Sequence, residues 1–175
     1  MRMYTRLTGL LLAALFRWQS FTGQSVLRFR VMPWDCVIKL MGNDRYHAFM
    51  DMGRLDLLLH LGGWRLLLTK KLQPFVYTAH IRYRYPLSLF RSFILRTRLI
   101  YVDGTFFWME HIFECKGVTM ATAISKNGLT WDDRIMPTTT IMQVGDLHKL
   151  HHLYSDQHIA KLSAVEKILR AMQYH

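Results

Sequence analysis

The chain has 175 residues, of which 51% are apolar and 20% charged, and no Pro- or Gly-rich linker divides it. This size and composition predict a single domain with a core of its own. Two cysteines, Cys36 and Cys115, exclude a disulfide framework, so we expect free thiols and a cytoplasmic protein. The net charge of +11 favours an acidic partner: nucleic acid, an anionic membrane or a phosphorylated small molecule. The alternative is a basic surface without a specific partner, because the cations are scattered along the chain.

The N-terminal segment contains an unbroken apolar run, Leu10 to Phe16, flanked by arginines. It superficially resembles a signal peptide, but the run is too short to span a bilayer, and no small-residue cleavage site follows it. We therefore predict an amphipathic helix over residues 1–22 that packs on protein. Peripheral contact of residues 1–18 with the inner membrane face is the alternative.

A strand and then a long helix are expected next. Val26 to Met32 alternates around two arginines and predicts a strand that Pro33 ends. From Asn43 the apolar residues recur at helical spacing, and Gly62-Gly63 marks the end of this helix. Its flanks are also apolar, so we expect it to be covered on more than one side. The stripe consists of Tyr46, Phe49, Met50, Gly53, Leu57 and Leu61.

Alternating residues at close spacing predict a run of four strands after the helix. Turn signals at Asp103-Gly104, Lys116-Gly117 and Asn127-Gly128 suit antiparallel hairpins. The sequence therefore predicts an antiparallel meander on one side of a buried helix. The four segments are Phe75 to Tyr85, Leu89 to Val102, Thr105 to Cys115 and Val118 to Ser125.

The last part of the chain, residues 143–175, is expected to be a helical extension whose final helix runs from about Asp156 to Met172. Within it, His148 and His152 have the spacing of two metal ligands on one helical face. No acid or cysteine at matching spacing accompanies them, so a solvated or interface face is favoured. We expect neither a metal nor a cofactor.

A motif runs from the first strand into the helix. Its residues are Phe29, Val31, Pro33 and Asp35 at the start, then Met41, Asn43, Arg45, Tyr46, Asp51 and Arg54. With this motif the chain resembles, over roughly residues 26–127, the hot-dog thioesterase family related to 4-hydroxybenzoyl-CoA thioesterase. The resemblance implies an α+β hot-dog fold, with an antiparallel sheet wrapped around a long central helix. We assign this domain to residues 23–142, with extra N- and C-terminal helices outside it.

The chain departs from the family pattern where the chemistry is expected. Val37 occupies the place of the second aspartate, which in characterised relatives attacks the thioester or activates water. Gly42 replaces an asparagine, and the family histidine is missing between Leu40 and Met41. A valine can neither attack a thioester nor activate water.

Thioester hydrolysis needs an oxyanion stabiliser and a carboxylate. Backbone amides at the helix start, around Gly42, Asn43 and Asp44, satisfy the first requirement. For the carboxylate we name Asp35 and Asp51 as candidates. Each nearby acid also has a structural alternative. Asp35 suits a turn acid, Asp44 a helix cap, and Asp51 an ion pair with Arg54.

Two functions follow from the resemblance. The first is an acyl-CoA thioesterase with Asp35 or Asp51 as catalytic acid, and the second is a protein that binds an acyl or CoA-like ligand without turnover or serves as a structural subunit. A hot-dog dehydratase is a third and weaker hypothesis. Aromatic strand residues flanked by arginines would also suit nucleic-acid binding, but no RNA-binding motif accompanies them, so we expect no nucleic-acid partner. The resemblance also implies a homodimer or a dimer of dimers. The expected substrate-binding residues are Gly42, Asn43, Asp44, Tyr46 and Arg54, although Tyr46 also suits core packing.

Overall fold

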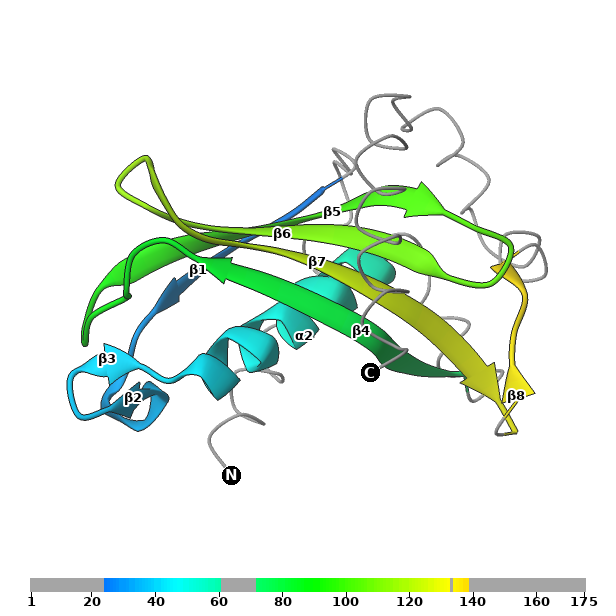
Figure 1. Cartoon of the computed structure of the whole chain (residues 1–175), viewed down its shortest axis with the longest axis horizontal. Helices are drawn as coiled ribbons and strands as arrows, with labels where there is room; N and C mark the ends of the chain where they lie inside the picture. The colour runs from blue at the N-terminus through cyan, green and yellow to red at the C-terminus, as the bar shows by residue number, and fades with distance from the viewer. Residues whose placement is uncertain (1–23, 61–71, 133, 139–175) are drawn as a thin grey trace, which may run out of the picture.

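The structure, a computed structural model, describes residues 24–60, 72–132 and 134–138. In this part of the chain one long helix, α2, lies along the concave face of a curved antiparallel sheet (Figure 1). The predicted helices over residues 1–22 and 143–175, with His148 and His152, lie outside the described residues. The elements are β1 (Gln24–Arg30), β2 (Cys36–Val37), β3 (Leu40–Met41), α2 (Asn43–His60), β4 (Gln73–Tyr83), β5 (Ser92–Val102), β6 (Phe107–Cys115), β7 (Val118–Trp131) and β8 (Arg134–Ile135).

The large sheet has the strand order β1-β5-β6-β7-β4, and β8 pairs with the end of β7. Only β5, β6 and β7 form a meander. The prediction that all four strands follow one another was wrong for β4, which crosses to the far edge and pairs antiparallel with β7. The short β2–β3 hairpin stands apart and leads directly into α2.

The predicted turn at Asn127-Gly128 was also wrong, because β7 continues through it to Trp131. Asn127 is buried, and its Nδ2 donates hydrogen bonds to the backbone oxygens of Phe107 and Ser125. At Gly128 a Cβ would meet the ring of Phe75, so the glycine makes room for an aromatic side chain within the strand. Both residues therefore serve packing between strands and not a reversal of the chain.

The core is split into two apolar clusters along α2. The first surrounds the start of the helix with Tyr46, Phe49 and Met50, and the second surrounds Leu57 near its end. Between them Gly53 meets β5, where a Cβ would collide with the Thr97 hydroxyl. The glycine on the predicted stripe thus permits the close approach of helix and sheet.

One end of the molecule is tied together by backbone hydrogen bonds. Residues 31–42 and 84–91, which we call the hairpin pole, lie where α2 begins (Figure 1, beside β2 and β3). Met41 N–H donates to Leu87 O at 2.8 Å, Leu89 N–H to Lys39 O at 2.9 Å, and Phe90 N–H to Val31 O at 2.9 Å. The hairpin is therefore braced by the connection between β4 and β5.

The described residues include both cysteines and the long helix. Cys36 and Cys115 are free thiols, as predicted. No helix in the described part of the chain is long and apolar enough to cross a membrane.

Candidate functional site

The start of α2 presents two backbone amides. Gly42 N–H is already used, because it donates to Asp35 O at 2.9 Å, and Gly42 O accepts from Arg45 N–H at 3.0 Å. The Gly42 amide, which the sequence offers as a donor, is therefore not available. Within the described residues no partner is recorded for the N–H groups of Asn43 and Asp44, which both lie at the positive end of the helix dipole.

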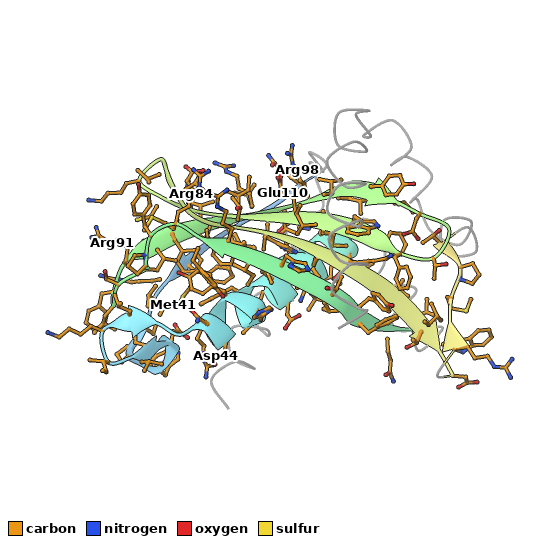
Figure 2. The ribbon with its side chains drawn as sticks, in the orientation of Figure 1. Met41, Asp44, Arg84, Arg91, Arg98 and Glu110 are labelled. Atoms are coloured by element: carbon orange, nitrogen blue, oxygen red, sulfur yellow. The ribbon has the colours of Figure 1, made fainter. Side chains whose placement is uncertain are left out.

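Two side chains lie over Gly42. A Cβ at Gly42 would sit 3.4 Å from Val37 Cγ2 and 2.6 Å from Asp44 Oδ1. Val37, which the sequence motif aligns with the aspartate expected from the resemblance, therefore faces the start of α2, and it is 70% exposed there. The Asp44 carboxylate converges on the same point from the helix (Figure 2 labels Asp44 at this end). Asp44 remains largely exposed and forms an ion pair with Arg45, with Nε 3.1 Å from Oδ2.

Asp35 is turned into the protein. It ends a single 3-10 turn, Pro33–Asp35, and only 3% of its surface is exposed. Its Oδ2 accepts a hydrogen bond from Met32 N–H at 2.9 Å, while its backbone oxygen holds Gly42. Through these two contacts Asp35 connects the segment after β1 to the start of α2.

Asp51 lies further along the helix. Its carboxylate is 61% exposed and pairs with Arg54 Nη2, which is the intrahelical ion pair that the spacing suggests. The Arg54 side chain is largely covered, and its Nη1 is buried without a hydrogen-bond partner in the described part of the structure. Arg54 therefore points its second nitrogen toward the interior.

Tyr46 belongs to the core. It is 2% exposed and packs edge-on against Tyr83 and Phe113, with ring centroids 5.0 and 4.9 Å away. Burial raises the pKa of the Tyr46 hydroxyl, and a backbone hydrogen bond from Leu87 partly opposes this. Tyr46 thus packs in the core, which is the alternative that its place on the apolar stripe suggested.

A buried polar band crosses the concave face of the sheet between the two apolar clusters. His111 Nδ1 lies 3.0 Å from Thr97 Oγ1, and His111 Nε2 lies 2.9 Å from Ser125 Oγ. Asn127 Nδ2 also donates to Ser125 Oγ at 2.9 Å. Burial lowers the pKa of His111 to about 3, with a smaller contribution from the cation of Arg54. Its imidazole is therefore neutral at pH 7.

The band continues under α2. Asp56, buried on the helix, accepts a hydrogen bond from Ser25 Oγ at 2.6 Å, and His60 Nδ1 lies 3.6 Å from its Oδ2. Sequence reasoning missed these residues. A signal was present, because polar residues at inward positions of apolar strands are costly to bury and need partners. In the described part of the chain, no group of three or more His, Cys, Asp or Glu side chains could hold a metal ion.

The chain belongs to the thioesterase-like superfamily, whose family model matches residues 31–131. A comparison with curated proteins finds no match. The matched residues cover β2 to β7, the helix and the hairpin pole, while β1 and β8 lie outside them. The assignment agrees with the resemblance found in the sequence motif.

Similar solved structures show the fold. A probable thioesterase from Bartonella henselae is 20% identical, with a TM-score of 0.60 over 65% of this chain and 98% of that one. BH1999 gentisyl-coenzyme A thioesterase is 23% identical, with a TM-score of 0.61 over 65% and 94%. A mutant 4-hydroxybenzoyl CoA thioesterase complexed with 4-hydroxybenzoyl CoA is 12% identical, with a TM-score of 0.60 over 66% and 93%. These similarities confirm the hot-dog fold.

Proposed function

We propose that the protein is an acyl-CoA thioesterase whose site lies at the start of α2. The observation that carries the proposal is the convergence of Asp44 Oδ1 and Val37 over Gly42, next to the amides of Asn43 and Asp44. The names of two similar structures, a gentisyl-coenzyme A and a 4-hydroxybenzoyl CoA thioesterase, support an acyl-CoA substrate.

The amides of Asn43 and Asp44 supply the electrostatic half of the reaction. The thioester carbonyl becomes negatively charged in the transition state, and N–H groups without protein partners at a helix start are suited to receive that charge. Gly42 has no side chain, which leaves room for the Asp44 carboxylate to lie over it. Its own amide stays on Asp35 O and holds the loop in place.

Asp44 is the acid that the geometry favours as general base. Asp35 is buried and bonded to Met32 N–H, and Asp51 is paired with Arg54 more than one helical turn away. Asp44 is exposed beside Val37, where the relatives keep their reacting carboxylate. It would take a proton from water as the water attacks the thioester carbon, and the thiolate of CoA would leave.

Binding without turnover is the second candidate, and Val37 is the observation that favours it. A methyl group occupies the position of the family acid, and Arg45 already neutralises the nearest carboxylate. In that case the amides would hold the ligand while no group activates water. The same protein would then bind an acyl-CoA without releasing thiol.

Thiol release from a panel of acyl-CoA substrates distinguishes the two candidates. We expect hydrolysis that falls about 10²- to 10⁴-fold in Asp44→Asn. The matched control Asp51→Asn should keep activity near that of the unchanged protein. Ligand-induced thermal stabilisation without thiol release would support binding alone. Neither hydrolysis nor stabilisation at high concentration would refute both.

We also propose a homodimer that pairs through β4. This strand has β7 on one side, and within the described residues its other edge is unpaired over 11 residues. Val76, Tyr77 and Tyr83 are exposed along it. An open, apolar edge of this length favours pairing with another strand.

A further inference from the structure

The hairpin pole exposes apolar side chains next to the proposed site. Among the described residues, six large apolar side chains of the pole are between 40 and 90% exposed. Clusters of this kind usually mark a surface that contacts something else. The six are Trp34, Val37, Ile38, Leu40, Tyr85 and Phe90.

Ile38 is held outward by an unfavourable backbone. It is 90% exposed and has φ +65°, and Phe90 at the same pole has φ +62°. A β-branched residue in the left-handed region is a genuine outlier, since Gly or Asn fits there without strain. The hydrogen bonds of Lys39 O and Met41 N–H fix the end of the turn and the strand that follows it. The fold thus presents an isoleucine to solvent at a cost, and nothing in the described packing requires that residue.

Cations are also found on the pole and at the adjoining end of β1. Arg30, Lys39, Arg84 and Arg91 are exposed, and Figure 2 shows Arg91 at this end. Arg30 Nε donates to Phe90 O at 2.9 Å, with its guanidinium 5.8 Å from the centre of that ring. Within residues 31–44 and 84–91 the acids are Asp35, which is buried, and Asp44, which is paired with Arg45. The exposed pole is therefore both apolar and positively charged.

We propose that the hairpin pole docks on an anionic lipid bilayer, a role that goes beyond the proposed function and does not depend on it. Ile38 and Val37 enter the boundary between headgroups and acyl chains, with Trp34 at headgroup level. The four cations contact lipid phosphates. Two copies meeting pole to pole would place four cations against four, and Ile38, the most exposed of the six apolar side chains of the pole, has no ring for stacking on a base.

Vesicle co-sedimentation of the full chain tests this surface. We expect binding to phosphatidylcholine vesicles that contain phosphatidylserine and little binding to phosphatidylcholine alone. Ile38→Asn should bind roughly tenfold more weakly, because it removes an inserting side chain. It should also unfold at the same or a higher temperature, because Asn tolerates the left-handed turn. The matched control is Ile135→Asn on β8, which should bind as the unchanged chain does.

The proposal would be refuted if the protein did not bind the anionic vesicles. It would also be refuted if Ile38→Asn bound them as strongly as the unchanged chain does. A polarity-sensitive dye on Ile38→Cys, in a chain that also carries Cys36→Ser, separates this surface from residues 1–18. The dye should move to a less polar environment on anionic vesicles, whereas the same dye on Ile135→Cys should not. A bound protein whose dye at position 38 stays in water, or an Ile38→Asn variant that changes only the oligomeric state, would also overturn it.

Discussion

Gly53 determines how closely α2 lies on the sheet. Replacing it with Ala gains about 1 kcal/mol of helix propensity, while overpacking costs about 1–3 kcal/mol. The new Cβ would also press on Thr97, whose hydroxyl is bonded to His111 and cannot turn away freely. We therefore predict that Gly53→Ala lowers the free energy of unfolding by about 2 kcal/mol in denaturant titrations. Gly104→Ala is the control, because a Cβ there meets nothing within 4 Å; a Gly53→Ala protein of unchanged stability would contradict the packing.

His111 makes stability depend on pH. Its pKa is lowered from 6.5 to about 3 in the folded protein, so below pH 6.5 the unfolded chain binds a proton that the folded protein does not. The free energy of unfolding should therefore fall by about 1.4 kcal/mol per pH unit as the pH drops from 6.5 toward 3. Above pH 6.5 this contribution is complete.

Denaturant titrations at pH 7 and pH 5 measure this dependence. In His111→Gln the difference in stability between the two pH values should shrink by about 2 kcal/mol, although the variant is less stable at both. His80→Gln, at an exposed position on β4, should retain the full difference. An undiminished difference in His111→Gln would assign the pH dependence to other groups.

Val37 lies beside the helix start, at the position where the sequence motif predicts a carboxylate. Val37→Asp restores an acid within reach of the Asn43 and Asp44 amides, and position 37 is exposed enough to accept the charge. We predict a rise in acyl-CoA hydrolysis of about tenfold or more, measured as thiol release. No increase in a folded Val37→Asp protein would mean that the amides and the acyl group do not meet at this point.

At the scale of elements, the sequence predicts whether a segment forms a helix or a strand better than it predicts which strands pair. The periods of β1, α2 and β5 to β7 are visible because each element buries one stripe or face. The position of β4 at the far edge is a long-range pairing that no local pattern encodes. Asn127-Gly128 misleads for a related reason, since its turn chemistry is overridden by the Phe75 ring and by buried hydrogen bonds.

The open edge of β4 leads to a prediction about assembly. Val76 is exposed on this strand, and a lysine at an edge discourages pairing with a second strand. We expect Val76→Lys to shift a dimer toward monomer in light scattering, while Val118→Lys at the β6–β7 turn leaves the mass unchanged. A dimer that tolerates Val76→Lys would place the interface elsewhere.

At the scale of the whole molecule, the candidate site was only partly predictable. The motif from Phe29 to Arg54 locates the helix start and the substituted acid, because these residues are contiguous in the chain. It could not show that Asp35 turns inward, that Gly42 donates to it, or that Asp44 lies over Gly42, since these depend on the folded loop. The polar band at His111 joins three strands and is likewise assembled only by folding.

An NMR titration of backbone amides tests the central claim most directly. The ligand is an acyl-CoA analogue in which a CH2 group replaces the thioester sulfur, so that the carbonyl remains and hydrolysis is blocked. We predict that the Asn43 and Asp44 amide protons shift downfield as they donate to this carbonyl, while the Gly117 amide on the β6–β7 turn does not move. Binding of the analogue with unchanged Asn43 and Asp44 resonances would contradict the account.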